Sequence, residues 1–283
     1  MFSKINIKNF IKCPSPKETA DFVACTWIEK ELEKFLVQNK SDEDLDPDVK
    51  ERAIDQLRIS RLMACDRAIE IDPQNAEAWY KKGAALDELS RFDDAIDAYD
   101  KAIKIKTQNA EAWNNKGADL GRLGRYDDSV TAFEKAIEIN PRYAVAWYNK
   151  GAVLGQLGKF DDALKLFDKA IEIFPQYAQA WTNKGITLSN LGKYDDAIKA
   201  YDEALKIKPQ DEFVWHNKGI ALFKQRKYEE AIEAYDEAIK IRPRNAEAWH
   251  EKFVILQKLH RDSEAAAAFS KSIDMGYKEE SRF

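Results

Sequence analysis

A pattern of large and small apolar residues recurs every 34 residues through most of the chain. Six tryptophans mark the period: Trp79, Trp113, Trp147, Trp181, Trp215 and Trp249. Counting from three residues before each tryptophan defines six repeats, at 76–109, 110–143, 144–177, 178–211, 212–245 and 246–279. A fixed period of this length is typical of stacked supersecondary units that share one continuous core.

Within each repeat the pattern predicts two helices joined by a short turn. Tryptophan at position 4 and glycine at position 8 share one face of the first helix, because residues four apart stack on each other. The sequences LGRYDD, LGKFDD and LGKYDD supply a glycine that can adopt positive φ and acidic residues that suit the N-terminus of the second helix. Position 24 is aromatic in every repeat, and proline at position 32 of the middle four ends the second helix.

Two helices are predicted before the first repeat. Ser15 and Glu18 form a capping box around Pro16, and an amphipathic stripe then extends to about residue 38. After an acidic loop, Pro47 opens a long helix that runs through Ile71. The stripe consists of Phe22, Cys25, Trp27, Ile28, Leu32, Phe35 and Leu36.

Residues 1–75 are therefore interpreted as an N-terminal segment and helical cap over the first repeat. The register of the repeats continues backwards into 42–75, where Cys65 takes position 24 of a degenerate repeat whose first half has diverged. The alternative interpretation of this region is a docking helix for a specific partner.

The last repeat departs from the pattern. Phe253 replaces the glycine of position 8 and Asp262 the aromatic residue of position 17, and the final helix is expected to stop at Gly276. The tail at 280–283 is too short to cover that helix. Its AAAAF face is thus a candidate surface for self-association.

The repeat columns resemble the tetratricopeptide repeat: Trp at 4, Gly at 8, an aromatic residue at 17 and 24, Ala at 20 and 27, and Pro at 32. The resemblance covers about 204 of 283 residues. It implies an all-α superhelical solenoid of antiparallel helix pairs, with first helices lining a concave groove. Proteins of this kind are non-catalytic scaffolds or adaptors that bind a peptide segment, extended or helical. A self-associating structural protein and an accessory subunit of an enzyme complex remain alternatives.

Composition and motifs argue against nucleic-acid binding, catalysis, a metal site and a membrane span. The formal net charge of -5 gives no sign of the basic surface that nucleic-acid binding requires. The three cysteines form no CxxC pair, no GxSxG, phosphate-binding glycine loop or HExxH is present, and no run is long enough to span a membrane. We therefore expect no enzyme activity, no metal, no cofactor and a cytoplasmic location.

The groove implied by the resemblance offers the candidate binding residues. Asparagine recurs at position 6, and each amide could donate to and accept from a peptide backbone; the same column is also explained by packing between helices. The groove is expected to be acidic at its start and apolar and basic later. The candidates are Asn115, Asn149, Asn183, Asn217, Tyr148, His216, His250, Phe213, Phe223, Lys224, Glu77 and Glu88.

Lysine fills position 7 of all six repeats, from Lys82 to Lys252. A binding stripe is one interpretation. The other is structural, with each lysine stem covering the neighbouring tryptophan while the ammonium group meets an aspartate or solvent.

Overall fold

The computed structural model describes residues 47–278, and all regular secondary structure in that range is helical, as predicted. The chain divides into two units, Met1–Asn140 and Pro141–Phe283. The helices of the first unit are α2 (Pro47–Ile71), α3 (Ala76–Glu88), α4 (Phe92–Ile105), α5 (Ala110–Arg122) and α6 (Tyr126–Ile139). Those of the second unit are α7 (Ala144–Gln156), α8 (Phe160–Ile173), α9 (Ala178–Asn190), α10 (Tyr194–Ile207), α11 (Glu212–Lys224), α12 (Tyr228–Ile241), α13 (Ala246–Lys258) and α14 (Asp262–Asp274).

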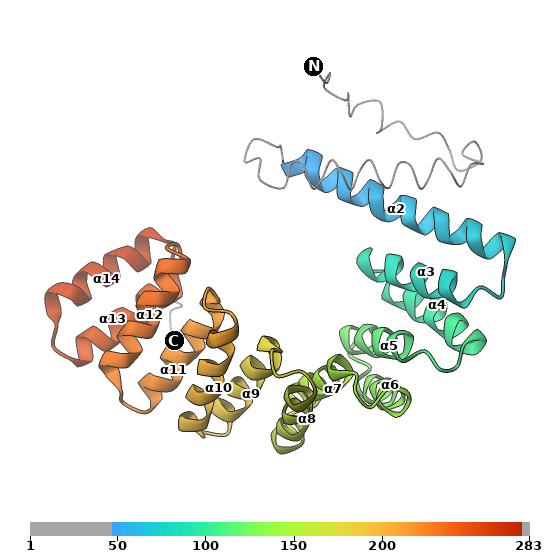
Figure 1. Cartoon of the computed structure of the whole chain (residues 1–283). Helices are drawn as coiled ribbons and strands as arrows, with labels where there is room; N and C mark the ends of the chain where they lie inside the picture. Colours follow the sequence, from blue (N-terminus) through green and yellow to red (C-terminus); the bar gives the residue numbers. More distant parts are fainter. Residues whose placement is uncertain (1–46, 279–283) are drawn as a thin grey trace. The chain divides into compact units, whose positions relative to one another are not determined.

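Each predicted repeat folds as a pair of neighbouring helices (Figure 1). The pairs are α3 with α4 and α5 with α6 in the first unit, and α7–α8, α9–α10, α11–α12 and α13–α14 in the second. Each second helix also packs on the first helix of the next repeat within its unit, as α4 does on α5 and α10 on α11. The core of each unit is therefore a row of small interfaces between sequence neighbours, as expected for a repeat fold.

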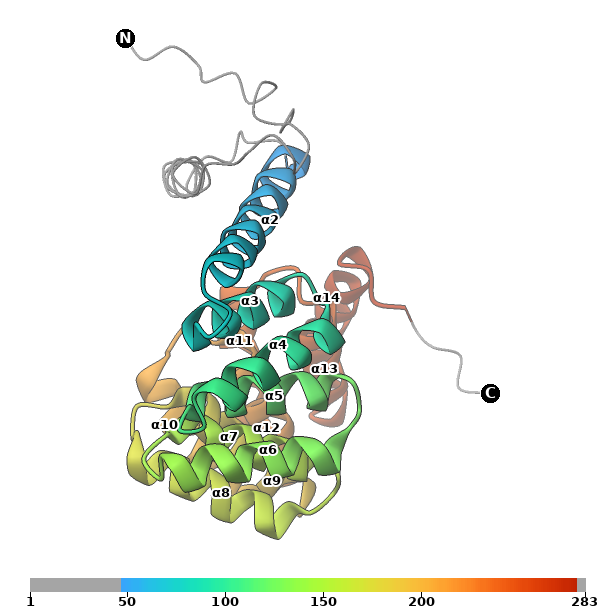
Figure 2. The ribbon, with the colours of Figure 1, turned by 90° about the vertical axis from the view of Figure 1, so that its right-hand side faces the viewer.

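The long helix predicted from Pro47 through Ile71 is present as α2 with those bounds. Figures 1 and 2 show its C-terminal half beside α3 and its N-terminal half extending beyond that helix. The helix predicted from Ser15 to about residue 38, and the tail at 280–283, lie outside the described residues.

Side-chain caps and the predicted glycine turns lie at the ends of the helices. Side chains at position 34, such as Asn75 and Asp211, accept a hydrogen bond from the backbone three residues on and so satisfy a donor at the start of the following first helix. At the turn, Gly124 takes the left-handed conformation with φ 75°. Ser90 and Arg226 adopt similar values at the equivalent position, φ 58° and 61°, at a steric cost that glycine avoids.

The glycine of position 8 is required by the aromatic residue of position 24 in the same repeat. A Cβ atom placed on Gly185 would lie 2.5 Å from Cε1 of Tyr201, whose side chain is 1% exposed. Equivalent close approaches link Gly83 to Tyr99 and Gly117 to Phe133. The paired helices therefore approach each other closely at this glycine, which explains why the pattern tolerates glycine inside a helix.

Tryptophan and lysine together join neighbouring repeats. In most repeats the tryptophan indole N–H donates to the carbonyl oxygen of a proline six residues before it, as Trp215 does to Pro209 at 3.0 Å. The lysine of position 7 lies over that ring and forms an ion pair with an aspartate of the preceding second helix; for Lys218 the distances are 5.1 Å to the Trp215 ring centroid and 2.6 Å to Asp202. The same ion pair joins Lys82 to Asp66, Lys116 to Asp100, Lys184 to Asp168 and Lys252 to Asp236. In these repeats the structural interpretation of the lysine column is thus supported.

Candidate functional site

The residues predicted to bind a ligand lie on the first helices, which contact one another directly within each unit. The contacts join α3 to α5, α7 to α9, and α9 to α11. We use the name first-helix face for the side chains at positions 2, 5, 6, 9, 12 and 13 of the first helices of one unit. Each unit has its own first-helix face.

Two of the predicted asparagines hold tyrosines of the preceding repeat. The Asn115 side chain donates to the hydroxyl of Tyr80 at 3.3 Å, and the Asn183 side chain donates to that of Tyr148 at 3.1 Å. Burial raises the pKa of both tyrosines, and the bonds from the amides oppose that rise. These amides therefore link repeats through their own protein's side chains.

The other two asparagines differ. Asn217 donates to the backbone oxygen of Phe213 at 2.7 Å, one turn back in α11, and Asn149 is half-buried at the same repeat position in α7. Pairing of any of these amides with a peptide backbone stays a prediction.

Tyr148 is fixed by more than its hydrogen bond. Its ring centroid lies 4.9 Å from that of Tyr177 and 6.0 Å from that of Phe167. The half-buried Tyr148 ring thus packs against two other aromatic rings of its own unit, and its hydroxyl accepts a hydrogen bond from Asn183. Tyr148 is thus a pre-ordered residue of the first-helix face.

The acidic residues predicted at the start of the groove are exposed and paired. Glu77 lies 3.5 Å from Lys81, and Glu88 lies 3.4 Å from Arg61 on α2. Ion pairs between exposed side chains contribute about 0–1 kcal/mol. These glutamates are thus accessible to solvent and are not committed to the stability of the fold.

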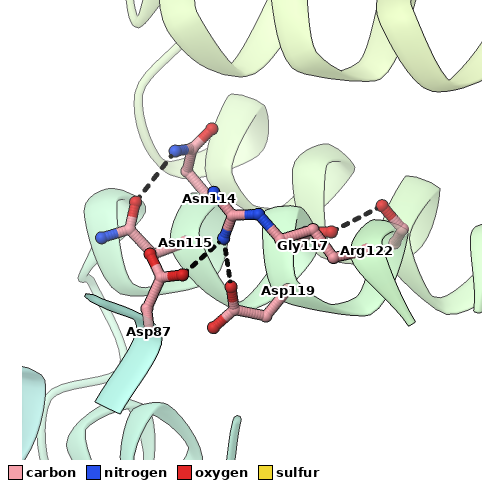
Figure 3. A network of polar contacts seen from close by, with 7 residues as sticks. Asp87, Asn114, Asn115, Gly117, Asp119 and Arg122 are labelled. Atoms are coloured by element: carbon pink, nitrogen blue, oxygen red, sulfur yellow. Dashed lines mark hydrogen bonds and ion pairs between the residues drawn. The ribbon is translucent and has the colours of Figure 1, made fainter. Parts of the chain in front are cut away.

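A charge cluster built around one buried carboxylate joins α3 and α5 in the first unit (Figure 3). The Asp119 side chain is 0% exposed, and Nη1 of Arg122 lies 2.6 Å from its Oδ1 and 2.6 Å from Oδ1 of Asp87 on the neighbouring α3. One guanidinium group therefore bridges two repeats. The second carboxylate oxygen of Asp119 and the buried Tyr99 hydroxyl make no hydrogen bond with the described residues.

Burial and charge shift the titration of this cluster. Burial raises the pKa of the Asp119 carboxyl and the nearby Asp87 carboxylate raises it further, whereas Arg122 lowers it, with a net pKa of about 7. Burial and the charge of Asp119 also raise the pKa of Tyr99. Asp119 is therefore able to change charge near neutral pH.

The pH dependence of stability tests this shift. Aspartate in an unfolded chain titrates near pH 4, so the folded state binds the Asp119 proton more tightly than the unfolded state does. The stabilising contribution is present at low pH and is lost as the pH rises toward 7. Between pH 5 and 7.5 we expect the free energy of unfolding of the parent to fall by about 1–2 kcal/mol more than that of Asp119→Asn, measured by urea unfolding.

The matched control for this comparison is Asp128→Asn. Asp128 also pairs with an arginine three residues away, Arg125, at 2.8 Å, but it is exposed. This variant should keep the pH profile of the parent. Superimposable profiles for the parent and Asp119→Asn would contradict a raised pKa at Asp119.

The second unit carries the apolar and basic candidates. The Phe213 side chain is 55% exposed at position 2 of α11. Phe223 lies near the end of the same helix, packed against Tyr228 with ring centroids 5.8 Å apart, and the Lys258 ammonium lies 6.0 Å from its ring. Lys224 follows and is exposed. Helix α11 thus carries an exposed aromatic residue, Phe213, and a partly exposed one, Phe223, which has the Lys258 cation beside it.

Both predicted histidines are packed against aromatic rings. The His216 ring is 5.5 Å from that of Tyr235 in an edge-on arrangement, and the His250 ring stacks on Tyr277 at 3.8 Å with an interplanar angle of 10°. The Nδ1 atoms of both histidines are buried without a hydrogen-bond partner among the described residues. Tyr277 therefore covers one face of the His250 ring.

The cluster of Asp87, Arg122 and Asp119 was not predicted from the sequence. A signal was present: position 10 holds Ala85, Val153, Thr187, Ala221 and Ile255 in the other repeats, so a carboxylate in that column is anomalous. Arg122, three residues after Asp119, could have indicated an ion pair on the same helix face. Within residues 47–278 no group of three or more His, Cys, Asp or Glu side chains is placed to hold a metal ion.

None of the described helices is both long enough and apolar enough to cross a lipid bilayer. No curated protein sequence matches the chain.

Several solved structures are similar to the chain. YrrB, described as a TPR protein with an unusual peptide-binding site, is 26% identical with a TM-score of 0.56, and the match covers 67% of this chain and 97% of that one. For MamA from Desulfovibrio magneticus RS-1 the values are 20% identity, TM-score 0.56 and coverage of 61% and 97%. For PilF from Pseudomonas aeruginosa they are 18%, 0.61, and 68% and 88%; these last two likenesses concern the fold alone.

Two family models described as the tetratricopeptide repeat also match the sequence. One matches residues 108–176 and 142–210, and the other matches 76–109 and 213–245. Together the matched segments cover more than half of the chain, and they coincide with the helix pairs described above. The chain belongs to the tetratricopeptide repeat family.

Proposed function

We propose that this protein is a non-catalytic interaction scaffold, and that the first-helix face of its second unit binds a peptide segment of another protein. The observation that carries the proposal is the exposure of Phe213 on that face, at 55% of its side-chain surface. Aromatic residues are enriched among those that dominate binding energy at protein interfaces. The likeness to YrrB, a TPR protein with an unusual peptide-binding site, supports the same assignment.

The chemistry of the face selects the ligand. Phe213 and Phe223 offer apolar surface, and Lys224 and Lys258 place cations beside it, one of them 6.0 Å from an aromatic ring. A segment with an apolar side chain followed by an acidic group or a carboxylate would match both features. Asn217 and Asn183 lie on the same face and offer amide groups to its backbone.

Substitution of Phe213 tests the assignment. A partner would first be captured with the parent protein, and the affinity of its binding segment would then be measured by fluorescence anisotropy. Phe213→Asp should weaken binding about thirtyfold or more, since loss of a dominant interface residue costs about 2 kcal/mol or more. The control is Phe174→Asp, because Phe174 is equally exposed, at 50%, but follows the second helix α8. Equal losses in the two variants, or none in either, would move the site away from this face.

Self-association through α14 is the second candidate function. Ile273 is 47% exposed and Phe269 is 36% exposed, whereas Ile239 and Tyr235 at the same positions of the preceding repeat are 8% and 0% exposed. The next first helix covers those earlier residues, and no described helix follows α14. A second copy of the chain could cover this face. Light scattering that gives a monomer mass at high protein concentration would exclude this function.

A further inference from the structure

The first described helix lacks a partner that the repeat architecture provides elsewhere. Within each unit a second helix packs both on its own first helix and on the first helix that follows, as α4 does on α3 and α5. By register α2 takes the place of a second helix, and it packs on α3 as the helix that follows. Among residues 47–278 no preceding helix pairs with it. Among the described helices, α2 therefore packs on the first helix that follows it but on no first helix of its own.

A groove lies between α2 and α3. Its volume is about 520 Å³. Six small apolar residues line it, three from each helix: Ala64, Cys65, Ala68, Ala78, Ala84 and Ala85. A groove lined in this way can take large apolar side chains without a clash, because none of the six side chains extends far from its helix.

The side chain at position 24 makes this groove different from the other interfaces. In the complete repeats that contain glycine at position 8, the aromatic residue of position 24 fills the space against it, as Tyr99 does against Gly83. On α2 that position holds Cys65, which is much smaller. Filling the space therefore requires bulk from the partner helix in place of glycine.

Residues 17–38 have the sequence properties of that partner. Their predicted helix carries Phe22, Trp27 and Phe35 among the apolar residues of its stripe. Its 22 residues would span about 33 Å, close to the length of the 25-residue α2. Residues 39–46 separate it from Pro47, a connection of the length that joins antiparallel helices.

The charged residues at the groove balance one another. Arg61 and Glu88 line it as one ion pair and Lys81 and Glu77 as another, so its rim favours neither sign of charge in the docking segment. We propose that residues 17–38 of this chain dock in the groove between α2 and α3 and complete the first, otherwise unpaired, repeat. This assignment concerns a different surface from the peptide site proposed above, so each can fail without the other.

Hydrogen exchange of the full chain, read by mass spectrometry, tests the proposal. Peptides spanning residues 22–36 should exchange about tenfold or more slowly than the intrinsic rate. Ala68→Arg, which places a long charged side chain in the groove, should return them to that rate. The matched control is Glu70→Arg, which adds an arginine to α2 two residues away at an exposed position. It should leave the protection of residues 22–36 unchanged.

Two further measurements keep the test decisive. If Ala68→Arg also loosens α2, Trp27→Asp supplies the disruption from the other partner, and it should abolish protection of residues 22–36 while α4–α6 keep theirs. Intrinsic exchange of residues 22–36 in the parent, or protection that survives both substitutions, would overturn the proposal. Protection found together with a dimer mass, and lost on dilution, would place the segment in the groove of a second copy and would equally overturn it.

Discussion

Replacing Trp215 with alanine is expected to lower the free energy of unfolding by about 3 kcal/mol, the lower end of the range for truncating a large aromatic residue, because the indole is only partly buried. The indole packs against two adjacent clusters of buried residues, one that includes Tyr201 and Leu205 and another that includes Leu222 and Ile255. Its removal therefore opens a cavity where two repeats meet. In a repeat fold such an interface supplies much of the stability of both of its neighbours.

The polar contacts of Trp215 would be lost as well. Its N–H donates to the Pro209 oxygen at 3.0 Å, and Lys218 lies over the ring while bonded to Asp202. Removal of the ring leaves the Pro209 oxygen without this donor and the Lys218 stem without its support. The two effects add to the cavity term.

Urea unfolding followed by circular dichroism would measure the change. Trp215→Phe is the informative control, because it keeps most of the ring but removes the N–H donor. That variant should lose about 1 kcal/mol from the missing hydrogen bond, and somewhat more from the smaller ring. A change below 1 kcal/mol for Trp215→Ala would mean that the interface between these repeats does not depend on the tryptophan.

Replacing Gly185 with alanine is expected to destabilise the protein by about 2 kcal/mol, although alanine is the better helix former by about 1 kcal/mol. The new methyl group would lie 2.5 Å from Cε1 and 2.7 Å from Cδ1 of Tyr201. That ring is 1% exposed, and its hydroxyl is 3.3 Å from the Ser189 hydroxyl, so it has little freedom to move aside. Overpacking at this site should therefore outweigh the gain in helix propensity.

Gly155→Ala is the matched control for this substitution. Gly155 also lies inside a first helix, α7, but a Cβ atom there would have its nearest neighbour at an ordinary 3.9 Å. This variant should gain about 0.5–1 kcal/mol from helix propensity alone. Thermal or urea unfolding of both variants gives the comparison. Stabilisation by both substitutions would show that Tyr201 gives way easily.

Most of the fold could be predicted from the sequence because each repeat carries its own signals. The tryptophan spacing located the helix pairs, and Pro47 and Gly276 marked the start of α2 and the end of α14 to within about two residues. The lysine of position 7 could also be interpreted correctly, since its tryptophan lies three residues away on the same helix. Local sequence is sufficient wherever the interacting residues share a helix or a turn.

The contacts at the candidate site could not be predicted from the sequence, because they join residues of different repeats. Asn183 bonds to Tyr148, 35 residues earlier, and Arg122 reaches Asp87 at the same separation. Such contacts depend on how one repeat is rotated on the next, and repeat spacing does not specify that rotation. The register assigns His250 to position 5 of its repeat, but its stacking on Tyr277 involves a residue that follows the last described helix and has no counterpart in the pattern.

The lysine–aspartate ion pairs between repeats have a consequence for how the number of repeats can change. The repeat at 178–211 presents Lys184 to Asp168 before it and Asp202 to Lys218 after it, so its two sides are complementary to each other. A second copy inserted in frame after residue 211 would find the same aspartate before it and offer the same aspartate to Lys218. Recombination between neighbouring repeats can therefore lengthen or shorten the gene product in steps of 34 residues while keeping this lysine–aspartate ion pair at the new junction.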